Sequence, residues 1–291
     1  MADWMCVYMT RLNKIIDLLE NEKPVIGTFV NNGNMDDLAF VTDAGYDFVI
    51  VENEHQGLDF PMLRLSLQSL LSRKKIVQSG TLQADPTPLV RVTPNSREQN
   101  QWMLKQTLDA GAYGLVLPVT ESVEAAQAAV VACRYPQRQG DPQPNPKGER
   151  GWHPQDIAVR YWGVGVDEYY EKSDLWPLDP SGEMILMALV ETVQGVANIG
   201  DILDQVKGIG AVFAGPGDLS IDMGLGGDAS GHPKVQEALL KVLGECKKRG
   251  IACATGVASE TDLDQRSEQG FRIFIDLPEK STATLQYLKS K

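Results

Sequence analysis

Short apolar segments recur along this 291-residue chain, and each is followed by a stretch with helical periodicity. Segments that are apolar nearly throughout are typical of parallel strands buried on both faces. The eight segments span residues 25–30, 48–53, 88–93, 114–119, 184–191, 210–215, 251–255 and 271–276. Eight β–α units in a chain of this length predict an α/β fold, the closed (β/α)₈ or TIM barrel.

A doubly wound open sheet is the competing interpretation. Such a sheet usually carries a glycine-rich phosphate loop after its first strand. The sequence there is "TFVNNGNMDD", which lacks the G-x-G-x-x-G spacing. We therefore favour a single barrel over residues 1–291. The first twenty residues are expected to form a lead-in helix over the barrel floor, and residues 136–183 interrupt the repeat as a long insertion.

Charge and composition exclude several classes of partner. The formal net charge is −12, which argues against binding to nucleic acid or to an anionic membrane surface. An anionic substrate would need a local positive centre. The four cysteines lack C-x-x-C spacing, so reduced thiols in a cytoplasmic protein are the simpler interpretation. We see no apolar stretch of membrane-spanning length and no signal-peptide core.

Polar residues follow several of the predicted strands at their carboxyl ends, where barrel enzymes place their active sites. The second strand runs into "VENEHQG". The strand-end candidates are Glu52, Glu54, His55, Arg91, Glu191, Thr192, Asp218, Ser220 and Asp276.

Glu191 and Asp218 follow neighbouring predicted strands. Two carboxylates that meet at a barrel mouth repel each other unless a cation separates them. Oxygen ligands favour a hard divalent ion, Mg²⁺ or Mn²⁺, with open positions for water or substrate. The plainer alternative is that Asp218 only caps a helix.

Arg91 and the segment "AGPGDLS" supply anion-binding groups. The amides around Gly217 and Asp218, next to Ser220, are expected to face an anion as helix N-termini do. Together with Arg91 and a metal they suit a small 2-oxo acid, because they would hold its carboxylate and stabilise an enolate oxygen. Alternatively, Arg91 only pairs with a neighbouring carboxylate.

His55 is the candidate general base, since an imidazole titrates near neutral pH. Glu52 or Glu54 could fix its tautomer. Strand alternation is expected to turn Glu54 away from His55, which favours Glu52. The plainer alternative is a structural histidine at a strand end.

The chain also resembles a known family, the metal-dependent class II pyruvate aldolases of the 4-hydroxy-2-oxoheptanedioate and 2-dehydro-3-deoxyglucarate aldolase type. The matching segments are "AGYDFVIVENEHQGLD", "PLVRVT", "LDAGAYGLVLPVTESVEAAQAAVVACRYP", "LVETVQGVANI" and "GAVFAGPGDLSIDMG". The resemblance implies a TIM barrel, a divalent metal on Glu191 and Asp218, His55 as base and Arg91 beside the enolate. It also implies a homo-oligomer, a hexamer or trimer of dimers that exchanges a C-terminal helix.

Three features depart from that family. Glu52 stands where the family usually has Asp, and Leu189 stands where it often has Gln. The insertion at 136–183 is longer than in compact members. We expect the insertion to climb the barrel wall or to meet a neighbouring subunit, so that Trp152 or His153 lies near the second substrate.

The leading functional hypothesis is cleavage of a 4-hydroxy-2-oxo acid to pyruvate and an aldehyde. Decarboxylation of oxaloacetate or another β-oxo acid is the alternative within enzymes, because the same enolate serves both reactions. A citrate-lyase-like or malyl-thioester lyase would want a site for coenzyme A phosphates, against which the acidic charge argues. A barrel that binds a 2-oxo acid without turnover is the alternative outside enzymes.

Overall fold

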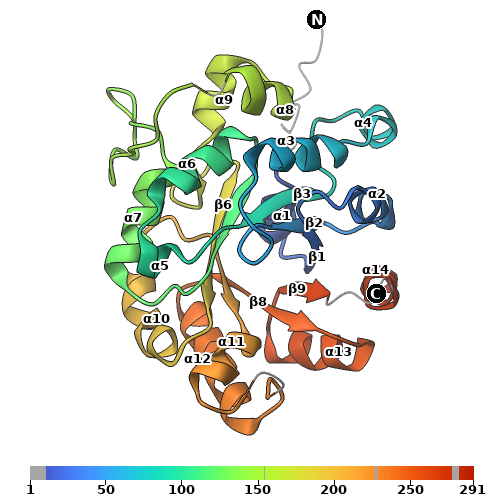
Figure 1. The fold of residues 1–291 in the computed structure, drawn as a ribbon, viewed down its shortest axis with the longest axis vertical. Coiled ribbons are helices and arrows are strands. Elements are labelled where there is room, and N and C mark those ends of the chain that lie inside the picture. Colours follow the sequence, from blue (N-terminus) through green and yellow to red (C-terminus); the bar gives the residue numbers. More distant parts are fainter. Residues whose placement is uncertain (1–10, 154, 227–228, 277–281) are drawn as a thin grey trace, which may run out of the picture.

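The computed structural model describes residues 11–153, 155–226, 229–276 and 282–291. Its strands are β1 (Val25–Asn31), β2 (Phe48–Glu52), β3 (Thr87–Arg91), β4 (Gly114–Leu117), β5 (Leu175–Trp176), β6 (Met184–Val190), β7 (Ala211–Ala214), β8 (Ala252–Val257) and β9 (Ile273–Asp276). All strands but β5 form a parallel barrel in chain order, which the pairings of β4 with β6 and of β1 with β9 close (Figure 1). The predicted TIM barrel is confirmed.

Each of the eight predicted segments overlaps one barrel strand, and the bounds differ by a few residues at most. The additional strand β5 was not predicted, and it pairs with the start of β6 through two residues only.

Helices surround the barrel in the described part of the chain. They are α1 (Lys14–Glu20), α2 (Met35–Ala44), α3 (Phe60–Ser69), α4 (Arg73–Ser79), α5 (Asn95–Glu98), α6 (Gln101–Asp109), α7 (Val123–Cys133), the π-helix η1 (Gln155–Val159), α8 (Arg160–Trp162), α9 (Val166–Lys172), α10 (Val193–Gln205), α11 (Pro216–Asp222), α12 (Pro233–Lys248), α13 (Glu260–Gln269) and α14 (Ala283–Ser290). Of the helices in these ranges, none combines the length and the apolar character needed to span a membrane.

Strand residues alternate between two cores. Phe48 and Ile50 of β2 belong to a cluster inside the barrel, whereas Val49 and Val51 belong to the cluster between the barrel and its helices. This period of two is the geometry of a strand buried on both faces. It decides which strand-end side chains converge above the barrel axis.

The floor of the barrel is closed by α1. Its residues Ile15 and Leu19 join the inner cluster, so this helix covers the amino ends of the strands. The predicted lead-in helix is therefore confirmed over residues 14–20, and its part in residues 1–10 lies outside the described residues. Three cysteines, Cys133, Cys246 and Cys253, are buried and free, and Cys6 lies outside the described residues.

The insertion at residues 136–183 packs at the floor end and along the outer wall. The Trp162 ring stacks on Tyr113 with 4.2 Å between ring centroids, and its Nε1 donates to the carbonyl oxygen of Gly111 at 3.0 Å. Gly111 and Tyr113 immediately precede β4 and thus belong to the floor end.

Trp152 lies at the same end, against Tyr135 and Tyr170. His153 lines a hollow on the outer wall with Phe60 of α3 and Gln106 of α6. The expected position of Trp152 or His153 beside the second substrate is therefore not found within the single chain. Contact of the insertion with a neighbouring subunit stays a prediction.

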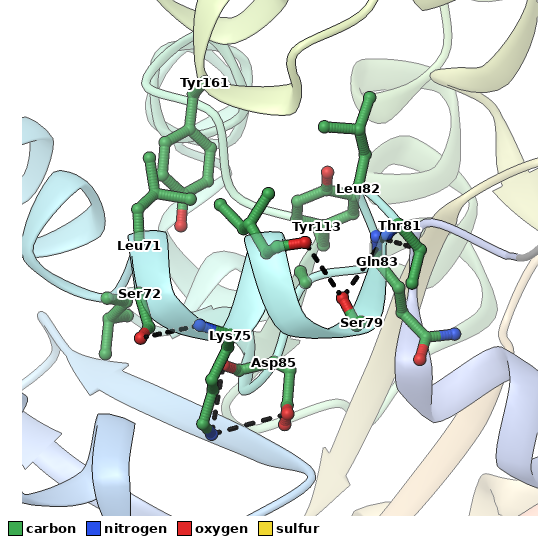
Figure 2. A pocket seen from close by; sticks show the side chains of 13 residues that line it. Leu71, Ser72, Lys75, Ser79, Thr81, Leu82, Gln83, Asp85, Tyr113 and Tyr161 are labelled. Atoms are coloured by element: carbon green, nitrogen blue, oxygen red, sulfur yellow. Dashed lines mark hydrogen bonds and ion pairs between the residues drawn. The ribbon is translucent and has the colours of Figure 1, made fainter.

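A cavity of about 80 Å³ lies under α4 (Figure 2). Tyr113 and Tyr161 line it together with Lys75, whose Nζ lies 3.4 Å from Asp85 Oδ2. Tyr113 and Asp85 precede β4 and β3, so the cavity belongs to the floor end. It is remote from the strand ends that carry the candidate site.

Gly114 provides a test of the strand register. A Cβ on Gly114 would lie 2.2 Å from the carbonyl oxygen of Ile185, its register partner on β6. Because neither backbone can move without breaking the barrel, Gly114→Ala should lower the free energy of unfolding by about 3 kcal/mol or more. Gly244→Ala on α12, where a Cβ meets nothing within 4 Å, should instead raise it by about 0.5–1 kcal/mol. Urea denaturation measures both, and equal stability of the two variants would contradict the register.

Candidate active site

Glu52 and Arg91 are register partners at the carboxyl ends of β2 and β3. They continue the inward-facing series of their strands. Arg91 Nη2 lies 2.5 Å and Nε lies 2.6 Å from Glu52 Oε2. The guanidinium carbon lies 4.9 Å from the centre of the Phe29 ring on β1. The Arg91 side chain is thus oriented by one charged and one aromatic neighbour.

Glu52 also holds the turn that follows β2. Its Oε1 accepts the backbone N–H groups of Glu54 at 2.6 Å and of His55 at 3.0 Å. We expected Glu52 to orient the His55 imidazole, but its carboxylate contacts the His55 backbone instead. The reason is that β2 ends at Glu52, so the chain turns there and brings its amides back to this carboxylate.

Glu54 approaches the His55 imidazole, which corrects the prediction from strand alternation. Glu54 Oε2 lies 3.6 Å from His55 Nε2 and 3.2 Å from Arg91 Nε. The Glu54 side chain is 8% exposed, whereas that of His55 is 62% exposed. Burial raises the pKa of Glu54; Arg91 and His55 oppose this shift, and Glu52 and Asp218 add to it. Glu54 therefore links the candidate base to the candidate enolate-stabilising cation.

Glu191 follows β6 and is buried, with 4% of its surface exposed. Its Oε1 accepts the backbone N–H of Val119 at 2.9 Å. Burial raises the pKa of Glu191 to about 8, because the Val119 N–H only partly offsets it and Asp218 and Glu54 add like-charge repulsion. A carboxyl in this setting accepts either a proton or a cation readily.

Asp218 lies in the first turn of α11 and is exposed. The turn that leads to it passes close to Glu191 at Gly215. A Cβ on Gly215 would lie 2.7 Å from Leu189 Cδ1 and 3.3 Å from Glu191 Cβ, so a larger residue here would displace both side chains. A Cβ on Gly217 would meet nothing within 4 Å. The backbone at Gly217 is thus open to a ligand.

Three other predicted residues have structural partners. The Ser220 hydroxyl is buried and lies 2.7 Å from the carbonyl oxygens of both Gly217 and Gly226, to either of which it can donate its one hydrogen. It therefore holds the loop around α11 and does not face a substrate. Asp276 accepts the Tyr46 hydroxyl at 2.8 Å on the helix side of the barrel. Thr192 caps α10 through the Gly195 N–H at 2.9 Å.

Glu191 and Asp218 are a suitable donor set for a hard divalent cation. Within the described residues, no group of three or more His, Cys, Asp and Glu side chains is arranged to hold a metal. Mg²⁺, however, is usually bound by one or two carboxylates and keeps its remaining positions for water or substrate. Burial and the repulsion by Asp218 both disfavour the charged form of Glu191, and a bound cation would offset this cost.

Val119 is a site residue that sequence reasoning missed. It lies in the loop after β4, and nothing in "LPVTES" distinguishes its backbone from its neighbours. Extending strand alternation beyond the end of β2 predicts that Glu54 turns away from His55, and the structure shows that this extension fails. The segment "ENEH", with two acids beside a histidine, is the sequence signal that points to both Glu52 and Glu54 as site residues.

Comparison with known proteins gives consistent results. The family model HpcH/HpaI aldolase/citrate lyase matches residues 26–279. A 4-hydroxy-2-oxo-heptane-1,7-dioate aldolase from Salmonella arizonae is 30% identical over 258 residues, which cover 89% of this chain and 85% of that protein. The protein of the same description from Klebsiella pneumoniae is 29% identical, covering 85% of this chain and 81% of its own.

Two solved structures are similar over nearly the whole chain. An HpcH/HpaI aldolase/citrate lyase family protein from Burkholderia cenocepacia superposes with a TM-score of 0.75 at 25% identity, covering 96% of this chain and 98% of that one. An HpcH/HpaI aldolase from Desulfitobacterium hafniense gives a TM-score of 0.70 at 27% identity, covering 94% and 93%.

The pKa of Glu191 predicts how metal-free protein responds to pH. Because the folded-state pKa is raised from 4.5 to about 8, the folded protein binds more protons than the unfolded one between these values. The free energy of unfolding should therefore fall as pH rises through this window. Glu191→Gln removes this contribution, so the chelator-treated variant should melt at a higher temperature than wild type at about pH 8. The exposed Glu237→Gln is the control, and parallel pH profiles of wild type and Glu191→Gln would contradict the shift.

Proposed function

The chain belongs to the HpcH/HpaI aldolase/citrate lyase family and is an aldolase-type carbon–carbon lyase, and on that premise we propose that it cleaves a 4-hydroxy-2-oxo acid to pyruvate and an aldehyde with the help of Mg²⁺ or Mn²⁺. The name of its relatives, 4-hydroxy-2-oxo-heptane-1,7-dioate aldolase, supports this substrate class. We propose that the reaction is reversible, so that the protein also condenses pyruvate with an aldehyde.

The observation that carries the proposal is the placement of Arg91. Its guanidinium is held by Glu52 and Phe29 on the inward face of the barrel, it contacts Glu54, and its charge acts on Glu191. A fixed cation of this kind stabilises negative charge that develops on a substrate oxygen, without reorganising during the reaction.

Glu191 and Asp218 would hold the divalent ion. When bound, the ion supplies Lewis-acid polarisation of the 2-oxo group. Gly217 lies in the first turn of α11 and its backbone is open, so the amides of this turn are suited to the substrate carboxylate. This helix has only seven residues, and the anion contact is therefore assigned to the turn and not to a helix dipole.

His55 would take the proton from the C4 hydroxyl as the C3–C4 bond breaks. Its imidazole is largely exposed, so it can reach a substrate that is bound above the strand ends. Glu54 lies on one side of its Nε2 at 3.6 Å, and this carboxylate favours the imidazolium that forms after proton transfer.

The decisive assay measures pyruvate release from a panel of 4-hydroxy-2-oxo acids, with Mg²⁺, with Mn²⁺ and after chelation. The proposal expects metal-dependent release from at least one member of the panel. Release of pyruvate from oxaloacetate alone would replace the aldolase with a decarboxylase. Binding of pyruvate without any turnover would favour a binding barrel and reject both reactions.

His55→Ala separates two reactions on one purified protein. Loss of a general base should lower aldol turnover by about 10²–10⁴-fold. Decarboxylation of oxaloacetate requires no hydroxyl deprotonation, so it should largely survive in the variant. If aldol cleavage persists with an unchanged pH dependence, His55 is not the base.

Arg91→Lys tests the enolate-stabilising cation. Lysine keeps the charge but cannot copy the planar guanidinium that pairs with Glu52 and reaches Glu54. We expect kcat to fall by about 10²–10³-fold, with a smaller effect on pyruvate binding. Arg138→Lys is a matched control, since Arg138 also pairs with a carboxylate, Glu171, but lies on the insertion. A wild-type kcat in Arg91→Lys would refute the role.

A further inference from the structure

Val119 has a backbone conformation that its side chain disfavours. Its φ is +53°, in the left-handed region. β-branched residues rarely adopt this region, because their Cβ substituents crowd the backbone. Glycine or asparagine would adopt it more readily, yet the chain has valine there.

The surrounding structure fixes the loop on both sides of Val119. The Thr120 N–H donates to the carbonyl oxygen of Leu189 at 3.0 Å, and the Thr120 hydroxyl donates to that of Leu117 at 2.9 Å. The carbonyl oxygen of Glu121 accepts the Asn198 side-chain amide at 2.8 Å. Strained residues persist only where their neighbours determine the conformation in this way, and they concentrate at functional sites.

The strained conformation directs one donor at one acceptor. The Val119 N–H lies 2.9 Å from Glu191 Oε1. On its other side Glu191 packs against Gly215, where an added Cβ would lie 3.5 Å from Oε2. The two oxygens of this buried carboxylate are thus in distinct settings, one bonded to a fixed amide and the other beside the turn that leads to Asp218.

We propose that Val119 is a positioning residue, whose strained backbone fixes the orientation of the Glu191 carboxylate so that Oε2 is presented to the divalent cation. This proposal rests on the metal site of the proposed function. Hydrogen bonds of this kind to a ligating carboxylate typically contribute 10–100-fold to metal affinity, a range known for outer partners of metal ligands. Because the donor is a backbone group, no side-chain pattern in the sequence records it.

An amide-to-ester exchange tests the proposal at one atom. Replacing Val119 by its 2-hydroxy acid removes the N–H and keeps the isopropyl side chain. The chelator-treated protein is then titrated with Mn²⁺, and free Mn²⁺ is read by electron paramagnetic resonance. We expect Mn²⁺ binding about 10–100-fold weaker than in wild type.

The matched control is the same exchange at Val193. Its N–H donates to Asp222 Oδ2 at 2.7 Å, so it is also a valine amide bonded to a carboxylate at the barrel mouth, but to an acid outside the metal pair. This ester should bind Mn²⁺ as wild type does. Val119→Asn keeps the N–H and accepts a positive φ, so it should bind Mn²⁺ with wild-type affinity. A role for the valine side chain would predict weaker binding in this variant.

Each outcome decides a separate point. Wild-type protein that binds no Mn²⁺ would refute the metal site itself, and with it the role of Val119. Wild-type protein that binds Mn²⁺ while the Val119 ester binds equally well would refute the positioning role alone. Equal weakening in the Val119 and Val193 esters would also overturn it, because the loss would then not pass through Glu191.

Discussion

The candidate site depends on the ion pairs that the Arg91 guanidinium makes with Glu52 and Glu54. The chain is strongly acidic, with a formal charge of −12, and it gathers Glu52, Glu54, Glu191 and Asp218 at one end of the barrel. The side chains of Glu52, Glu54 and Glu191 are buried, and buried carboxylates are costly unless they are paired. Arg91 contacts two of them directly. The register of β2 and β3, in which Glu52 and Arg91 are partners, makes this pairing a property of the barrel and not of a loop.

The fold was largely predictable because its strands are buried on both faces. Such strands appear in the sequence as continuous apolar segments, and each of the eight barrel strands overlaps one predicted segment. β5 was missed because a two-residue strand has no periodicity to detect. The position of the insertion was not predictable either, since it depends on tertiary contacts such as the Trp162 ring on Tyr113, which no local pattern encodes.

The strand-borne residues of the site were predictable, and the loop geometry was not. Alternation along a strand places Glu52 and Arg91 on the inward face, and Glu191, one residue beyond β6, still follows it. Alternation fails two and three residues beyond the end of β2, which is why the expected contacts of Glu52 and Glu54 with His55 are the reverse of those found. Ser220 was assigned from its position in "GPGDLS", but a hydroxyl can satisfy its own loop, as this one does. The strained backbone at Val119 could not be predicted, because a valine gives no indication of a positive φ.

The two ends of the barrel have different physical roles. At the floor, α1 inserts Ile15 and Leu19 into the inner core, and aromatic packing by the insertion covers the start of β4. This end contributes apolar burial and therefore stability. At the mouth, a buried carboxyl with a raised pKa, a strained valine and close like charges all oppose folding in the absence of a cation. A ligand that binds only the folded protein stabilises it, so binding of a cation would offset the destabilisation of the empty site. The unfavourable arrangement at the mouth is thus what prepares the proposed site for a cation and a 2-oxo acid, and the apolar floor is what allows the barrel to tolerate it.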